Sequence, residues 1–421
     1  MKQPVSADRR FALALAGLVL FILAHGGAQA GGFYLPEIAT PGSVGTAGAA
    51  NPTNTLDSSS AITNPAAMVH LEKDRAYMVG GQIMAPEMSF DSDIATGGGS
   101  DGGNAGDVAF TPGFSYARRI DDNSSIGFGL SALMGGGVDY GDNFVGRYQA
   151  TSAVLTGAGL TASYGYKVND EVSIGAGITA VYTVFEQDVA INRPGALPDG
   201  EVSLEDLDGW DPQFTLGLTW RLNPKALLGI VYRSKAEIEL DGKLKTKNLP
   251  APPFTLLDGQ NITLEFDAPE VFEVGLRYEL DANTTLFLEA DIERFSQFDQ
   301  NYLTIDSLGQ TVVLDRDWDD TWRVSAAILK RSGKDLFSYG IGYDSSPVDD
   351  EDRTFDLPVD EQLRLSFAWG REIDADSRWA LTSEYLSLGD NKIDQTAQGV
   401  RAKGDFDAYM IIIGANYERR F

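Results

Sequence analysis

The sequence has no cysteine and only two histidines in 421 residues. His25 lies in an N-terminal stretch that we expect to be removed, which leaves His70. Without thiols there is no disulfide framework, no thiol nucleophile and no cysteine-based metal site. One histidine is a poor basis for a zinc site or for a serine–histidine–aspartate triad. The sequence therefore predicts a protein that is not an enzyme and that needs neither a metal nor a cofactor.

Basic residues are also scarce. The chain has 33 lysines and arginines against 61 acidic residues, a formal net charge of −28. Removal of residues 1–30 takes away three basic residues and one acid, which leaves 30 against 60. A chain with this charge repels nucleic acid and anionic membrane surfaces. We therefore expect no nucleic-acid partner.

Long apolar runs are missing beyond the N-terminus. Residues 1–30 read as a secretory signal peptide, with Lys2, Arg9 and Arg10 before the apolar run "FALALAGLVLFILA" and with "AQA" at the cleavage site. A membrane anchor is the alternative, but the run is shorter than the ~20 residues that a spanning helix needs. We expect the mature chain to begin at Gly31.

The remaining apolar residues alternate with polar or small ones. The stretch 213–222 is typical: its apolar positions are Phe214, Leu216, Leu218, Trp220 and Leu222, and Gln213, Thr215, Gly217, Thr219 and Arg221 lie between them. The stretches 271–280 and 362–370 repeat the pattern. A period of two indicates strands with one apolar and one polar face.

The connections between these strands alternate between short turns and long polar stretches. Six short turns fall at 121–123, 168–170, 222–224, 280–283, 331–334 and 374–377. Seven longer stretches, among them 190–210, 300–317 and 389–404, are expected to be loops. This predicts an all-β fold, a transmembrane antiparallel β-barrel of about fourteen strands over residues 75–421, in the outer membrane of a Gram-negative bacterium. A soluble β-sandwich would also alternate, but its strands are usually shorter.

The last strand ends on a bare aromatic, Phe421. Tyr409, Ile411, Ile413, Ala415 and Tyr417 precede it on the same face of the strand. We assign this face to lipid and expect Phe421 to close the barrel as an interfacial anchor. The pattern also resembles the signal that the outer-membrane insertion machinery reads, so we expect that machinery and the outer-membrane lipids as partners.

Residues 31–74 do not alternate and are rich in Gly, Ala, Ser, Thr and Asn. A disordered periplasmic tail is one interpretation. Their scattered apolar residues, such as Phe33, Leu56 and Ile62, instead favour a compact plug (hatch) inside the barrel lumen, which must otherwise be open water. The inward charges of the barrel are expected to form salt-bridged networks; they are Glu273, Arg277, Glu289, Asp291, Arg323 and Arg364.

"GGFYLPE", followed by "SSAITNPAAM", resembles the plug of the FadL family of outer-membrane long-chain fatty acid and hydrocarbon transporters. Asn64, Pro65 and Ala66 match the Asn-Pro-Ala motif of that plug. The similarity continues through "VYRSKAEIELDGKL", "RFSQFDQ", "DWDDTWRV" and "YDSSPVDDEDRTFDLP", so it covers nearly the whole mature chain. The resemblance implies a plugged barrel of fourteen strands.

The resemblance also implies a kink in the third strand that opens a lateral exit into the membrane. By position the kink falls on Gly135, Gly136 and Gly137, with Leu133 and Met134 lining the exit. Glycine suits a kink, because it tolerates strained dihedrals and leaves no side chain. A flexible loop after the third strand is the alternative. Phe33, Tyr34 and Leu35 are expected either to occupy or line a ligand pocket or simply to form plug core.

The expected function is passive transport of hydrophobic molecules, either fatty acids or related lipids and hydrocarbons, through a plug-gated pocket and the lateral exit. Family members that bind fatty acid place a basic residue near the end of the fifth strand, whereas "AVYTVFEQDV" here is apolar and acidic. This difference favours neutral hydrocarbons or other lipids as ligands. The alternatives are a general porin and a receptor or structural barrel.

Overall fold

The computed structural model describes residues 37–193, 195, 197–251 and 254–421. In this part of the chain nineteen strands form one sheet. The strands are β1 (Arg75–Ala95), β2 (Ala109–Arg119), β3 (Ser124–Asp139), β4 (Ser152–Lys167), β5 (Val172–Ile191), β6 (Gly200–Asn223), β7 (Ala226–Arg233), β8 (Ala236–Lys247), β9 (Gln260–Ala268), β10 (Val271–Asp281), β11 (Thr284–Glu293), β12 (Gln300–Ile305), β13 (Gln310–Asp315), β14 (Thr321–Ser332), β15 (Asp335–Asp344), β16 (Gln362–Glu372), β17 (Ser377–Ser387), β18 (Ile393–Ala397) and β19 (Val400–Arg420).

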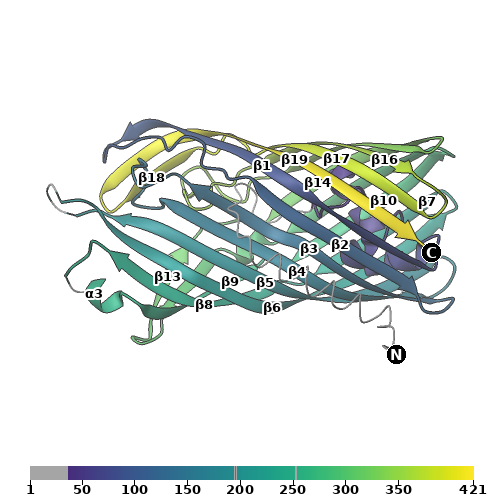
Figure 1. The fold of residues 1–421 in the computed structure, drawn as a ribbon, viewed down its shortest axis with the longest axis horizontal. Coiled ribbons are helices and arrows are strands. Elements are labelled where there is room, and N and C mark those ends of the chain that lie inside the picture. The colour runs from purple at the N-terminus through teal and green to yellow at the C-terminus, as the bar shows by residue number, and fades with distance from the viewer. Residues whose placement is uncertain (1–36, 194, 196, 252–253) are drawn as a thin grey trace, which may run out of the picture.

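These strands close into an antiparallel barrel of fourteen strands, as the sequence predicts. Five barrel strands are interrupted, so that two consecutive segments lie end to end along a neighbour; these are β7–β8, β9–β10, β11–β12, β13–β14 and β17–β18. The first and last strands pair from Ala76↔Arg420 to Ala95↔Ala402 and close the cylinder. Figure 1 shows β19 in yellow beside β1, with the strands tilted across the long axis.

The strands turn their apolar faces outward and their polar faces inward, which is the reverse of a soluble β-sandwich. On β6 the outward Phe214, Leu216 and Trp220 are 53%, 56% and 46% exposed, whereas the inward Gln213 and Thr215 are 2% and 3% exposed. Apolar side chains therefore cover the outside of the cylinder and polar ones line its lumen. This is the arrangement of a barrel whose solvent is hydrocarbon.

The ends of the barrel differ in their connections. The six predicted short turns all lie at the end where the chain terminates, which we call the turn end. The longer connections lie at the opposite loop end. The predicted loops at 190–210, 300–317 and 389–404 are wrong: β5 and β6 stay paired out to Ile191↔Gly200, residues 300–315 form the β12–β13 hairpin, and residues 393–404 belong to the β18–β19 hairpin.

The helices are short. Among the described residues, four lie before β1: η1 (Val44–Thr46), η2 (Asn51–Thr53), α2 (Ser60–Thr63) and η3 (Pro65–His70). Of the others, α3 (Phe254–Leu257) belongs to the β8–β9 connection at the loop end, and η4 (Phe295–Gln297) lies in the interruption between β11 and β12. Within the described ranges, no helix has the length and apolar character needed to cross a membrane.

Candidate functional site

Residues 37–71 lie inside the barrel, and we call them the lumen segment. In Figure 1 its short helices appear in purple among the strands near the turn end. Its helices contact strands on several sides of the wall: η1 touches β14–β17, η2 touches β7 and β10, α2 touches β2–β4, and η3 touches β2–β6. Val44, Ala49 and Ala61 are completely buried. The lumen segment therefore fills the bore of the barrel at this height.

Close approach of wall and lumen segment explains some of the inward glycines. A side chain at Gly217 of β6 would overlap the amide of Asn64, and one at Gly229 of β7 would overlap the carbonyl of Pro52. Glycine in a strand often marks such an approach of another backbone. These wall positions are therefore part of the contact that holds the lumen segment.

The Asn-Pro-Ala motif joins the lumen segment to itself and to the wall. The Oδ1 atom of Asn64 accepts a hydrogen bond from the Ala66 N–H at 3.0 Å. Its Nδ2 atom donates to the carbonyl of Pro52 at 2.6 Å and to that of Leu218 on β6 at 3.3 Å. Pro65 opens η3, where its missing N–H leaves no donor unsatisfied. The motif thus fixes one turn of the lumen segment against β6.

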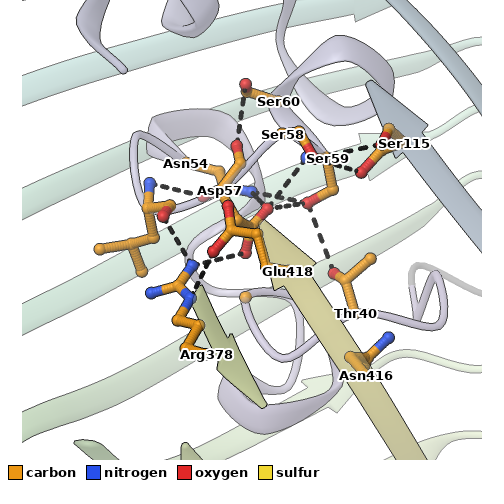
Figure 2. Close-up of polar contacts among 12 residues, drawn as sticks. Thr40, Asn54, Asp57, Ser58, Ser59, Ser60, Ser115, Arg378, Asn416 and Glu418 are labelled. Carbon is orange, nitrogen blue, oxygen red and sulfur yellow. Dashed lines mark hydrogen bonds and ion pairs between the residues drawn. The ribbon is translucent and has the colours of Figure 1, made fainter. Parts of the chain in front are cut away.

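Asp57 forms a second junction, shown in Figure 2. Its Oδ1 atom accepts hydrogen bonds from Asn54 Nδ2 at 3.0 Å and from the N–H and hydroxyl of Ser59 at 3.0 and 2.5 Å. Its Oδ2 atom lies 3.9 Å from Arg378 Nη2 on β17. Arg378 also bonds Glu418 on β19 at 2.5 Å and the carbonyl of Leu56 at 2.7 Å. Two strands and the lumen segment therefore share one guanidinium group.

Further bonds attach the lumen segment to β2 and β19. The hydroxyl groups of Ser58 and Ser115 on β2 lie 2.8 Å apart. Asn416 on β19 donates from Nδ2 to the carbonyl of Ala39 at 2.7 Å. These polar contacts are individually modest, and buried apolar residues such as Val44, Ala49 and Met68 add packing between the lumen segment and the wall.

Replacing Arg378 by methionine keeps the aliphatic stem and removes the charge. Asp57 and Glu418 are only 1% and 2% exposed, so each would remain as a buried carboxylate without its partner. We expect the free energy of unfolding to fall by about 3–5 kcal/mol. Thermal unfolding in detergent micelles, with proteolysis of residues 37–71 as a second readout, measures the effect.

Arg371→Met is the matched control, because its ion pair with Asp335 is half-exposed, with side chains 49% and 26% accessible. Loss of such a pair should change stability by less than about 1 kcal/mol. Equal stability of the two variants would contradict a role for Arg378 in holding the lumen segment.

The third strand leaves the wall halfway along its length. Its ladder with β2 ends at Phe114↔Leu130, although β2 begins at Ala109. Its ladder with β4 continues to Asp139↔Ser152, with a register shift between Ala132 and Met134 that makes Leu133 a bulge. A bulge bends its strand and increases its twist. The outer half of β3 therefore separates from β2.

Burial shows where this outer half goes. Residues 133–138 of β3 are all buried, whereas a wall strand with lipid on one side would alternate. This range includes Leu133, Met134 and the three glycines Gly135–Gly137, which lie within β3 and not in a loop. The backbone of Ala105 bridges Met88 of β1 at 2.8 Å and Asp139 at the end of β3 at 2.9 Å. The gap between β2 and β3 is thus framed at the loop end by the β1–β2 connection.

Two buried apolar clusters flank the displaced half of β3, and we call them together the apolar lining. The first contains Leu133 and Met134 with residues of β4–β6, β8 and β9, among them Leu155, Val181, Phe185, Ile238 and Phe266. The second contains Val138 with Met84, Phe90, Tyr140, Phe144 and Phe355. The rings of Tyr140 and Phe144 stack with centroids 4.1 Å apart. Apolar surface therefore leads from the loop end down to the bulge.

A polar belt lies between the first of these clusters and the lumen segment, whereas Val44 of the lumen segment packs in the second cluster. Arg233 pairs with Glu273 at 3.2 Å, and Arg323 pairs with both Glu289 and Asp291. In the same belt, Arg364 pairs with Asp344 and, at 2.7 Å, with Glu37 of the lumen segment. Most of the inward charges that the sequence predicts to be salt-bridged lie here; Arg277 pairs with Glu279 nearer the turn end.

A small cavity of about 30 Å³ lies where the belt meets the bulge. Its lining combines Leu133, Ile38 and Ile62 with Thr161, Thr179, Gln213, Glu273 and Glu293. This volume holds about one water molecule. The route from the apolar lining to the bulge is therefore closed in this conformation.

Phe421 ends the chain at the rim of the turn end. Its N–H donates to the Arg75 carbonyl at 2.8 Å, which seals the β1–β19 seam. The guanidinium carbons of Arg75 and Arg419 lie 4.4 and 5.3 Å from its ring centroid. The ring remains 43% exposed, which suits a position at the membrane interface.

His70 is the one histidine in the described ranges. Its Nε2 atom lies 3.0 Å from the hydroxyl of Thr219 and 3.4 Å from that of Ser173. Burial, with the positive charges of Arg221, Lys167 and Arg277, lowers the pKa of His70 to about 4. An imidazole with this pKa is a weak base for activating a serine near neutral pH.

Three acids at the loop end come close enough to share a cation. Asp299, Asp315 and Asp317 each place a carboxylate oxygen within 4.8 Å of the others. Two of them are exposed, and exposed acidic groups gather in this way without a metal. We assign them no role.

Several residues of the site have no local sequence signal. Asp57, Arg378 and Glu418 meet although 321 positions separate the first from the second, and Glu293 looks like any strand-end acid. The only sequence signal for Glu418 and Arg378 is their position in the alternation of their strands, which predicts that their side chains face the lumen. The predicted signal peptide 1–30 and the predicted pocket residues Phe33, Tyr34 and Leu35 lie outside the described residues.

A closed barrel with an apolar exterior and a filled lumen defines an outer-membrane β-barrel protein. The family profile described as "Outer membrane protein transport protein (OMPP1/FadL/TodX)" matches residues 21–421. The chain belongs to this family, whose members are transport channels and not enzymes, and it is an outer-membrane protein.

Curated relatives and solved structures agree with this assignment. A long-chain fatty acid transport protein of Escherichia coli O6:H1 is 24% identical over 373 residues, 80% of this chain and 83% of that protein. The structure of a Pseudomonas aeruginosa FadL homologue superposes with a TM-score of 0.85 at 21% identity and covers 93% of this chain and 100% of its own. The Ralstonia pickettii toluene transporter TbuX has a TM-score of 0.67 at 16% identity, with 87% and 94% covered.

Proposed function

We propose that this protein carries hydrophobic molecules passively across the outer membrane and releases them sideways into the bilayer at the gap between β2 and β3. The observation that carries the proposal is the outer half of β3. It leaves β2 after Leu130, bulges at Leu133 and lies between two apolar clusters. An apolar molecule gains nothing from a wide aqueous pore, so a route along apolar surface is the physical requirement.

The proposed route has three steps. A ligand adsorbs at the loop end, which faces the outside, because short turns face the periplasm in such barrels. It then moves along the apolar lining to the bulge. There it leaves through the gap into hydrocarbon, down its concentration gradient and without an energy source.

In this proposal residues 31–74 form the plug, and 1–30 a signal peptide. The plug closes the bore below the polar belt, and its movement opens the cavity beside Leu133, which now holds only about 30 Å³. A ligand that binds the open form better shifts the population toward it. Phe33, Tyr34 and Leu35 occupy or line the ligand pocket in this proposal, and Phe421 is the residue that the insertion machinery reads.

The names of the relatives support a hydrophobic ligand: one is a long-chain fatty acid transport protein, one a toluene transporter and one a monoaromatic hydrocarbon channel. Uptake of radiolabelled dodecane by bacterial cells with and without the full-length protein tests the proposal. We expect uptake at least about threefold above the control cells, together with very little single-channel current, because the bore is filled. Large steady conductance without dodecane uptake would indicate a porin, and the absence of both would leave a receptor or structural barrel.

A further inference from the structure

One acidic group beside the proposed exit has no partner. Glu293 is the last residue of β11, is 9% exposed and lines the cavity beside Leu133. Its strand neighbours Glu289 and Asp291 both pair with Arg323. Throughout the part of the chain that the structure describes, no ion pair or hydrogen bond reaches the Glu293 carboxyl group. A buried polar group without a partner is unfavourable, so its position beside the gap points to a ligand group that bonds it.

The buried arginines are already paired with acids of the protein. In the described ranges five arginines and no lysine are fully buried, against ten acidic side chains. All five arginines already bond acids: Arg147 with Asp199, Arg316 with Asp356, Arg323 with Glu289 and Asp291, Arg353 with Asp350 and Asp360, and Arg364 with Glu37 and Asp344. Arg233 and Arg323 line the cavity, but both are already paired with acids, so a ligand carboxylate at the bulge would add a negative charge beside Glu273 and Glu293.

Arg233, Glu273 and Arg323 also line this cavity, and its uncharged polar groups are available to bond a hydroxyl group. Thr161 and Thr179 face each other across β4 and β5 with their hydroxyl oxygens 2.9 Å apart, and Gln213 lies beside them. A hydroxyl group is small enough for a space of about 30 Å³ and can both donate and accept. Apolar side chains of Leu133, Leu155 and Phe185 begin directly above.

We propose that Glu293 accepts a hydrogen bond from the hydroxyl head of an uncharged ligand with an apolar body, such as an alcohol or a phenol, and that the site rejects carboxylates. The proposal rests on the proposed transport function and adds to it the chemical class of the ligand. The hydroxyl group donates to the Glu293 carboxylate and accepts from a threonine hydroxyl. The apolar body lies along the apolar lining.

The first test compares three labelled probes of equal chain length, 1-dodecanol, dodecane and dodecanoate, at neutral pH in cells with and without the full-length protein. We expect protein-dependent uptake of dodecanol to exceed that of dodecanoate by at least about tenfold, because an unpaired buried carboxylate is so unfavourable. Equal uptake of all three probes would overturn the assignment of the ligand class and leave the transport function standing. If no probe enters above the control cells, the transport function fails and this inference fails with it.

The second test changes Glu293 itself. We expect Glu293→Leu to remove the preference for dodecanol over dodecane, a loss of about fivefold or more in the uptake ratio, and Glu293→Gln, which keeps an acceptor, to retain part of it. Glu265→Leu is the control, because Glu265 on β9 is exposed and outside the lumen. An unchanged ratio in Glu293→Leu would overturn the role of this residue. If Glu293→Leu prevents assembly of the barrel, the comparison of the three probes with the wild-type protein still tests the proposal.

Discussion

A disulfide between cysteines introduced by Ser58→Cys and Ser115→Cys should stop uptake of dodecane, and a reducing agent should restore it. The two serine hydroxyl oxygens lie 2.8 Å apart, one on the lumen segment and one on β2, so sulfur atoms in their place are close to bonding distance. The natural chain has no cysteine, so the introduced pair reacts only with itself. If the plug must move to open the cavity, the oxidised protein is held in the closed state. We expect uptake to fall by at least about tenfold.

A second cysteine pair provides the control. Thr304 and Thr311 face each other across the β12–β13 hairpin at the loop end, with hydroxyl oxygens also 2.8 Å apart. Cross-linking them by Thr304→Cys and Thr311→Cys joins two strands of the wall and leaves the lumen segment free. We expect uptake to be the same before and after oxidation of this pair. Uptake that persists in fully oxidised Ser58→Cys/Ser115→Cys protein would show that the lumen segment need not leave β2 during transport.

The barrel could be predicted from the sequence because its rules are local. In a strand of period two, Phe214 and Gln213 must face opposite sides, and the only solvent that tolerates so many outward apolar residues is lipid. The same logic placed Phe421 at the end of the β1–β19 seam. The short turns were also visible, because Asp and Asn at positions such as 121–123 form turns through their own side chains.

The errors lie at the loop end. Residues 200–210 and 300–315 belong to paired strands, but their many acidic and polar residues are interspersed irregularly with buried apolar ones such as Leu204, Leu207 and Ile305, so the apolar alternation that marks a strand is weak. The polar belt and the Asp57–Arg378–Glu418 junction were unpredictable in detail for another reason. The odd or even position of a charged residue along its strand shows that its side chain points inward. Its ion-pair partner, however, depends on which strands lie across the lumen and on how far the lumen segment extends along the barrel axis.

Along the barrel axis the lumen has three levels: the lumen segment, the polar belt and the apolar lining. At the turn end, inward glycines such as Gly217 and Gly229 admit the backbone of the lumen segment. Above it, the paired charges of the belt make a surface that an apolar molecule does not enter, because their desolvation would not be repaid. Above the belt the lining is apolar. In the proposed mechanism, a molecule that moves down this lining reaches the bulge and the belt at the same height, and it leaves through the gap beside Leu133.

Deleting Leu133 should therefore abolish uptake while the barrel still assembles. In the ladder with β4, Ala132 faces Ala158 and Met134 faces the adjacent Gly157, so removal of the bulged residue leaves a continuous register. Without the bulge, β3 loses the bend that carries its outer half away from β2, and its free edge can pair with the β2 residues that precede Phe114. We expect uptake of dodecane to fall to within about twofold of cells that lack the protein.

Deletion of Asp93 is the matched control. It removes the bulge in β1 at the loop end, where Ser92 faces Gly404 and Ile94 faces the adjacent Lys403, so the ladder with β19 also becomes continuous. This bulge is far along the strand from the proposed exit, and we expect normal uptake. The gel mobility of unheated and heated samples shows whether each variant forms a folded barrel. A folded protein without Leu133 that still takes up dodecane at the wild-type rate would contradict the β2–β3 gap as the exit.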